Sequence, residues 1–160
     1  MRLMSNRTPT LPRTARPFAA YAEQLAEAGL RPTRQRLALA RLLHAHGHRH
    51  VTAEMMHGEA LKAGQKMSLA TVYNALNQFT AAGLLRTLSL DGTTIFDTNL
   101  SPHSHMLDVT QGTLIDLAPG AVRVDATGGL PHGYALEGVD VIVRARPLPV
   151  SRPRKAPRKT

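Results

Sequence analysis

The chain has 160 residues, no cysteine and a formal net charge of +9. The lack of cysteine excludes disulfides and thiolate metal sites, including a structural zinc held by four cysteines. No apolar run is long enough to cross a membrane, and the start lacks the apolar core of a secretory signal, which predicts a cytoplasmic protein with no membrane partner. This length holds one ordinary domain or two small ones.

The positive charge lies at the two ends of the chain. Residues 1–17 hold four Arg, residues 147–160 hold three Arg and two Lys, and neither segment holds an acid, whereas residues 18–146 balance 11 basic against 11 acidic residues. Both ends offer little to bury, so we predict a disordered basic arm at 1–17 and a disordered basic tail at 147–160. Such tails either strengthen phosphate binding through counterion release or only aid solubility.

Three helices with polar caps are predicted in the first half. The caps are Thr33, Thr52 and Ser68, before helices at about 34–45, at about 53–62 and from Leu69 onwards. Two extended stretches follow, joined by Asp91-Gly92, a pair typical of tight hairpins. Helix, helix, helix and hairpin is the order of a winged-helix DNA-binding domain, which we place at residues 18–97.

The third helix has one apolar and one amide-rich face. Its apolar stripe is Leu69, Val72, Leu76 and Phe79, its opposite face is Ala70, Thr71, Asn74, Asn77 and Gln78, and Tyr73 borders the two. Amide side chains pair with adenine edges and Thr contacts thymine methyls, so this face suits the major groove of A/T-rich DNA. The alternative is an ordinary amphipathic surface helix.

The second half predicts a small sheet at residues 98–146. Extended runs at 103–109 and 113–117 are separated by Gln111-Gly112, and residues 135–145 end in valines at strand spacing. His103 and His105 are two residues apart, so in a strand both imidazoles face the same way and can hold one ion. The fold class is therefore α+β.

Taken together, these residues resemble the ferric uptake regulator family of bacterial metal-responsive repressors. The matching pieces are Ala28 to Thr33 with Arg36, His50 to Glu54, Leu69 to Asn74 with Leu76, Phe79 with Gly83-Leu84, Phe96-Asp97, His103-x-His105, Gly112 and Ile115-Asp116. The resemblance runs from about residue 20 to residue 147 and is denser in the first half. It implies a winged-helix domain followed by a small α/β dimerisation domain.

The resemblance also implies partners and DNA-contacting residues. The family binds double-stranded DNA as a homodimer, and a two-fold dimer matches inverted repeats. Arg31 takes the place of a basic residue that reaches the minor groove, and Tyr73 would meet a thymine, helped by Thr71, Asn74 and Asn77. Asn74 stands where many relatives have Arg, which weakens an expected guanine contact. We expect an A/T-rich operator and mainly repression.

The implied metal site has five ligands. The resemblance adds His50, Asp97 and Asp116 to His103 and His105. Three nitrogens and two carboxylates suit Fe²⁺ or Mn²⁺, and zinc accepts the same ligand types. Because His50 belongs to the first predicted domain and His103 to the second, ion binding would close the hinge between them, which makes DNA affinity depend on the ion.

Other functions remain open from the sequence. In the iron response regulator branch, members bind DNA when iron is scarce and respond to haem, and His103 and His105 would then be haem ligands, although this chain lacks the Cys-Pro haem motif of some members. A non-haem iron enzyme would use the two histidines with Asp97 or Asp116. The chain offers few strands for an enzyme barrel, so we predict a protein that is not an enzyme. A metal-blind architectural DNA-binding protein is the third alternative.

Several side chains have modest expected roles. His44, His46 and His48 are expected to have a solvated capping role at a helix end, with metal binding as the less favoured alternative. His57 and His132 have no partner that the sequence indicates, and Met55, Met56 and Met67 are expected to fill the core. Arg34 and Arg36 lie with Arg31 at the start of a helix, either near DNA or as a charged helix face.

Overall fold

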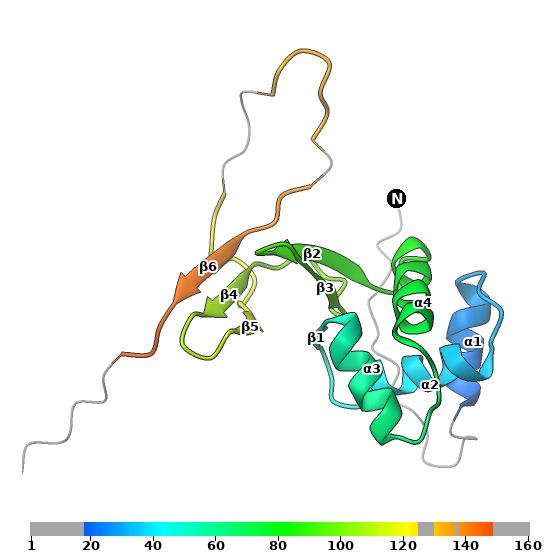
Figure 1. Ribbon diagram of the computed structural model, residues 1–160. Coiled ribbons are helices and arrows are strands. Elements are labelled where there is room, and N and C mark those ends of the chain that lie inside the picture. The colour runs from blue at the N-terminus through cyan, green and yellow to red at the C-terminus, as the bar shows by residue number, and fades with distance from the viewer. Residues whose placement is uncertain (1–17, 125–129, 137, 149–160) are drawn as a thin grey trace, which may run out of the picture. The chain divides into compact units, whose positions relative to one another are not determined.

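The computed structural model describes residues 18–124, 130–136 and 138–148 (Figure 1). The predicted arm at 1–17 and the predicted tail from residue 149 on lie outside these residues. The chain divides into two compact units between Leu100 and Ser101. The domain limits inferred from the sequence stay predictions.

The described residues of the first unit, from 18 to 100, hold four helices. They are α1 (Ala19–Glu27), α2 (Arg34–Leu43), α3 (Ala53–Lys62) and α4 (Leu69–Ala81). The predicted caps of the last three are confirmed, because the hydroxyls of Thr33, Thr52 and Ser68 each accept a hydrogen bond from the backbone amide three residues on. Helix α1 was not predicted, and its N-cap residue Phe18 makes no side-chain cap bond.

A three-stranded antiparallel sheet completes the first unit. Its strands are β1 (His50–Val51), β2 (Arg86–Leu90) and β3 (Thr93–Asp97), in the order β1-β3-β2. Asp91 and Gly92 both have positive φ, of 50° and 81°, as the predicted tight hairpin requires. Strand β1 was not predicted because two residues are too short to show an alternating pattern. Helices followed by a β-hairpin make a winged helix (Figure 1).

The apolar core of the first unit lies between the helices and the sheet. Leu25, Leu39, Met56, Leu76 and Phe96 come from five different elements and are all at most 1% exposed. Burial of this apolar surface is the main force that holds the helices in place.

Two apolar expectations were wrong. Leu69 was expected in the apolar stripe of α4, but it is 38% exposed, because it is the first residue of the helix and no earlier turn covers it. The buried stripe of α4 includes Ala75 together with Val72 and Leu76. Met55 is 50% exposed, whereas Met56 and Met67 are buried as predicted.

The second unit is a smaller sheet. Its strands are β4 (His105–Asp108), β5 (Thr113–Asp116) and β6 (Ile142–Ala145), in the order β5-β4-β6. Strand β4 pairs with β5 antiparallel and with β6 parallel. The strand predicted over 135–145 is reduced to the four residues of β6. The described part of 117–132 contains no helix, and neither does the rest of this unit where it is described.

The described residues thus form an α+β protein, as predicted. Within the described ranges, every helix is too short or too polar to cross a membrane.

Candidate metal centre and DNA-reading helix

Helix α4 exposes the face that the sequence predicts for DNA. Asn74, Asn77 and Gln78 are exposed, and Tyr73 is 37% exposed with its ring edge-on to the buried Phe96, at 6.0 Å between ring centroids. An aromatic ring held in this way keeps its orientation with little loss of entropy on binding.

The beginning of α4 fixes the place of Thr71. Its backbone amide and its hydroxyl both bond to the Ser68 hydroxyl, at 3.1 and 2.9 Å, and the residue is half-buried. The Thr71 hydroxyl therefore serves the helix cap, which leaves the methyl group as the part that suits thymine.

The three arginines near α2 differ in their surroundings. Arg31 and Arg34 are exposed. Arg36 is half-buried, and its guanidinium donates to Gln78 on α4 and to the carbonyl of Arg31. The Arg36 side chain is therefore bonded within the protein, and the two alternatives for Arg34 and Arg36, near DNA or as a charged helix face, stay predictions.

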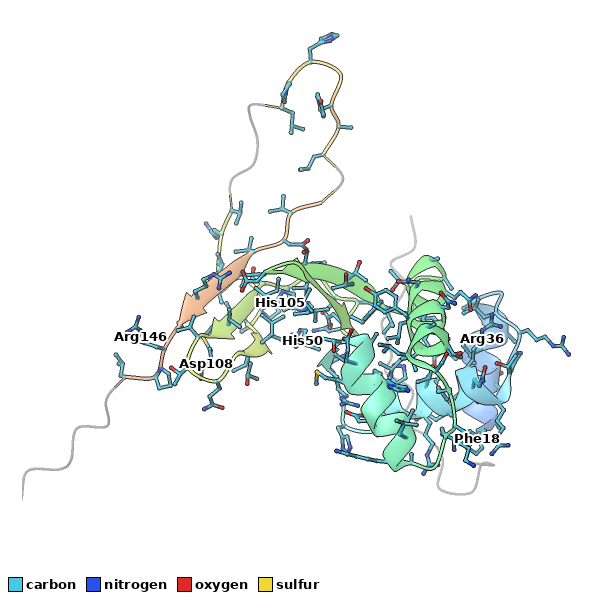
Figure 2. All side chains as sticks on the ribbon, viewed as in Figure 1. Phe18, Arg36, His50, His105, Asp108 and Arg146 are labelled. Carbon is cyan, nitrogen blue, oxygen red and sulfur yellow. The ribbon has the colours of Figure 1, made fainter. Side chains whose placement is uncertain are left out.

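Three predicted metal ligands come together in the second unit. His103 Nε2 lies 2.9 Å from His105 Nε2 and 3.3 Å from Asp116 Oδ1, and His105 Nε2 lies 3.9 Å from the same oxygen. The sheet register explains this grouping, because His105 on β4 lies directly opposite Asp116 on β5. His105 is buried at 1% exposure, and Figure 2 shows it on β4.

A second contact sets the orientation of His103. Its Nδ1 lies 2.7 Å from the carbonyl oxygen of Ser101, which can only accept a hydrogen bond, so Nδ1 donates. Nε2 of the neutral ring then carries the lone pair and points into the group. A backbone carbonyl behind a ligating histidine is a usual support of metal sites.

The remaining two predicted ligands lie together in the first unit. His50 on β1, labelled in Figure 2, is paired in register with Asp97, the last residue of β3. The His50 Nε2 atom lies 3.8 Å from Asp97 Oδ1. Asp97 is fully buried and its Oδ1 accepts a bond from the amide of Asn99, at 2.7 Å. The structure therefore gives one ligand group to each unit.

Arg49 and Thr98 hold the strand ends that carry His50 and Asp97. The amide of Arg49 donates to the Thr98 hydroxyl at 2.7 Å, and the amide of Thr98 donates to the Arg49 carbonyl at 3.1 Å. Sequence reasoning missed both residues, because an Arg in a His-rich run and a Thr after a strand carry no distinctive signal.

The Arg49 side chain ties this strand end to two helices. Its guanidinium donates to the carbonyl of Leu42 on α2 at 2.9 Å and makes a two-pronged pair with the carboxylate of Glu59 on α3. The Arg49 guanidinium lowers the pKa of Glu59, against the smaller opposing effect of burial.

The ligand atoms of the second unit fit one metal ion. Bonds of about 2.1 Å place neighbouring ligand atoms roughly 3.0–3.4 Å apart and opposite ones roughly 4.2 Å apart. The separations of 2.9, 3.3 and 3.9 Å match neighbouring positions after small movements. Imidazole nitrogen with carboxylate oxygen is a donor set for borderline divalent ions.

The other histidines have separate roles. His44 is the C-cap residue of α2, as predicted, but it is half-buried and stacked on Tyr21, so the prediction that it is solvated was wrong. Burial, and then the charge of His48, lowers the pKa of His44. His57 does have a partner, since its Nε2 lies 2.9 Å from the carbonyl of Met67, just before the Ser68 cap.

Comparison with known proteins decides the family. The model of the ferric uptake regulator family matches residues 27–140. The chain belongs to this family. The ferric uptake regulation protein of Pseudomonas aeruginosa is 36% identical over 102 residues, which cover 62% of this chain and 76% of that protein. A homologue from Archaeoglobus fulgidus is 36% identical over 86 residues, 54% of this chain and 67% of that one.

Solved structures of the family show the same fold. The ferric uptake regulator of Pseudomonas aeruginosa with manganese has a TM-score of 0.57 and 26% identity, over 78% of this chain and 96% of that one. A zinc-bound manganese uptake regulator has a TM-score of 0.59 and 25% identity, over 79% and 97%.

Membership confirms the coarse function. Ferric uptake regulators are metal-responsive, DNA-binding transcription regulators that form dimers, and this chain is such a regulator. The prediction that it is not an enzyme is confirmed by the same relationship, which also removes the non-haem iron oxygenase.

Proposed function

We propose that this ferric uptake regulator homologue represses genes of iron or metal homeostasis by binding A/T-rich inverted repeats as a homodimer, with a divalent ion setting its DNA affinity. The observation that carries the proposal is the convergence of His103, His105 and Asp116 on one point in a regulator of this family. Every member of this group offers a ligand atom that suits such an ion.

On the DNA side, the proposal rests on the exposed face of α4. Tyr73 and the amides of Asn74 and Asn77 meet base edges in the major groove, and Thr71 contacts a thymine methyl. Arg31, exposed ahead of α2, enters the adjacent minor groove, whose negative potential is strongest in narrow A/T tracts.

On the metal side, we propose that the two ligand groups serve one ion, as the family resemblance implies. Asp97 and His103 are six residues apart in the chain, so the tether between them spans at most roughly 20 Å. An ion that draws ligands from both groups restricts the movement of one unit against the other. In a dimer, that restriction fixes the spacing of the two α4 helices against successive half-sites.

The ligands suit manganese, ferrous iron or zinc. When bound, the ion supplies a positive charge that joins the imidazoles and carboxylates. Manganese accompanies the Pseudomonas aeruginosa structure and zinc the manganese uptake regulator, which supports both as candidates here.

Haem is the second candidate ligand for His103 and His105, in an iron response regulator type of switch. Imidazole is a common ligand of haem iron, so His103 and His105 are the residues that would hold a haem if one binds. The two Nε2 atoms are 2.9 Å apart and converge on one side, which favours neighbouring positions on a bare ion.

The proposal is tested by fluorescence anisotropy with a labelled A/T-rich inverted repeat at fixed salt. Metal-stripped protein is compared with protein given Mn²⁺, an air-stable stand-in for ferrous iron. We expect tight binding only with Mn²⁺, and its loss in the His103→Ala, His105→Ala double variant but not in His132→Ala, a change at an exposed histidine of the same unit.

Two other outcomes contradict this proposal in different ways. Tight binding by stripped protein that haem then abolishes supports the iron response regulator type. Equal affinity in every metal state, unchanged by the double variant, indicates a metal-blind DNA-binding protein.

A further inference from the structure

Arg36 links α2 to α4, the helix that we propose reads the DNA bases and that we call the reading helix. It lies on α2, and Figure 2 shows it among the helices of the first unit. Its Nε and Nη2 donate to Oε1 of Gln78 on α4, at 3.2 and 2.7 Å. Its Nη1 donates to the carbonyl oxygen of Arg31, at 2.8 Å.

The chemistry of this link makes it directional. A guanidinium has only donors, so the carbonyl end of the Gln78 amide must face it. The group is planar, and its two edges are used at once, one on Gln78 and one on the Arg31 backbone. A planar fork with charge-assisted bonds restricts position more tightly than a flexible ammonium group does.

The apolar contacts between α2 and α4 do not set this position by themselves. Leu39 and Leu76 are buried on the two helices. Apolar packing tolerates small shifts better than directed hydrogen bonds do, because its energy depends mainly on buried area and volume. The Arg36 link adds the directional element.

We propose that Arg36 is a positioning residue for operator recognition: it sets the distance between Arg31, which enters the minor groove, and α4, which reads the major groove. This inference rests on the proposed DNA-binding function. DNA fixes the spacing of adjacent grooves, so the two contacts form together only when the protein holds them at that spacing. Arg36 acts through Arg31 and Gln78 without a DNA contact of its own.

The chain offers a matched control on the same helix. Arg34 is exposed, and no hydrogen bond of its side chain is found among the described residues. Arg34→Met and Arg36→Met remove the same charge from α2. A role in phosphate neutralisation would make the two variants alike, whereas a positioning role makes them differ.

The experiment measures dissociation constants for operator and scrambled duplexes over a range of salt, with Mn²⁺ present. We expect Arg36→Met to lower the ratio of operator affinity to scrambled-duplex affinity, the operator preference, about tenfold, because a base contact is lost. The dependence of affinity on salt should stay unchanged, because no phosphate contact is lost. Arg36→Lys keeps the charge but should not restore the preference. Arg34→Met should leave the preference unchanged.

A double-mutant cycle with Gln78→Ala tests the link directly. Gln78 is exposed on α4, so its truncation leaves the core intact and carries the test even if Arg36→Met fails to fold. We expect Gln78→Ala to lower the preference as Arg36→Met does, and the double variant to lose no more than either single variant.

Three results would overturn the inference. They are additive losses in the double variant, a salt slope reduced by about one with rescue by Arg36→Lys, and an unchanged preference in Arg36→Met. If the unmodified protein binds both duplexes equally, the proposed operator recognition fails first, and the inference fails with it.

Discussion

The two units of this chain are stabilised in different ways. In the first unit, helices and sheet enclose a continuous apolar core that includes Leu39, Leu76 and Phe79. In the described part of the second unit, Leu107 is the one buried apolar side chain, at 6% exposure, and the other buried residue is His105. The comparison indicates that the proposed DNA-reading surface rests on a conventional apolar core, whereas the proposed metal ligands of the second unit lie where few described apolar side chains are buried.

The second unit also leaves apolar side chains exposed. Met106, Ile115 and Val143 lie side by side on β4, β5 and β6, on the face opposite His105, and Ile115 and Val143 are 44% and 37% exposed. A row of this kind suits a protein interface. Burial of the row in a dimer would cover apolar surface that the described residues of this unit leave exposed.

The sharpest test makes the same substitution in both units. Leu76→Ala should reduce the free energy of unfolding by about 4 kcal/mol, because Leu76 is fully buried in the apolar core. Leu107→Ala should reduce it by about 2 kcal/mol, because few buried side chains surround Leu107 among the described residues, so the structure can relax into the cavity. Urea unfolding followed by circular dichroism and by hydrogen exchange measures both. Equal losses of unfolding free energy from the two substitutions would contradict the difference in packing between the two units.

Metal addition should act on the second unit next most strongly. At a free Mn²⁺ concentration of 100 times its dissociation constant, ligand linkage stabilises the metal-bound form by about 2.7 kcal/mol. Amides of β4 and β5 should then exchange more slowly, and the effect should vanish in the His103→Ala, His105→Ala variant. His132→Ala is the control. Protection confined to α1 and α2 would contradict the assignment of these ligands.

A smaller effect is expected at the start of the reading helix. Ser68→Ala removes the cap of α4 and should cost about 1 kcal/mol of stability. It also frees the Thr71 hydroxyl from its partner. Thermal unfolding gives the stability change, and Ser68→Thr should restore most of it. If Ser68→Ala is neutral, the cap does not stabilise the reading helix.

The smallest effect concerns pH and the Arg49–Glu59 pair. Because Arg49 lowers the pKa of Glu59 from its ordinary value of 4.5, the pair stabilises the folded state above pH 4.5, and this contribution is lost as the pH falls through the lowered value. Glu59→Gln should therefore cost up to about 1 kcal/mol at pH 7 and progressively less below pH 4.5.

The pH dependence of that cost distinguishes the pair from a packing defect. Urea unfolding at several pH values measures it, with the exposed Glu23→Gln on α1 as control. A Glu59→Gln cost that is the same at pH 3 and pH 7 would show that the charge pair is not its source.

Local signals explain which elements were predictable. Three helices were predictable from their N-cap residues, Thr33, Thr52 and Ser68, because each cap hydroxyl accepts a hydrogen bond from an amide only three residues away. The hairpin was predictable from Asp91-Gly92, because few residue pairs tolerate two positive φ values. Helix α1 lacks a polar cap and strand β1 has two residues, so neither left a local pattern.

The sequence by itself determined the capped helices, the hairpin, the amide face of α4 and the ligand types, because these depend on neighbours within about four residues. Only the tertiary structure decided that Arg36 bonds across to Gln78, that Arg49 pairs with Glu59, and that Asp116 lies opposite His105. Those contacts join residues that lie 42, 10 and 11 positions apart in the chain. Chain folding brings such residues together, and no local pattern in the sequence reports which partner each will meet.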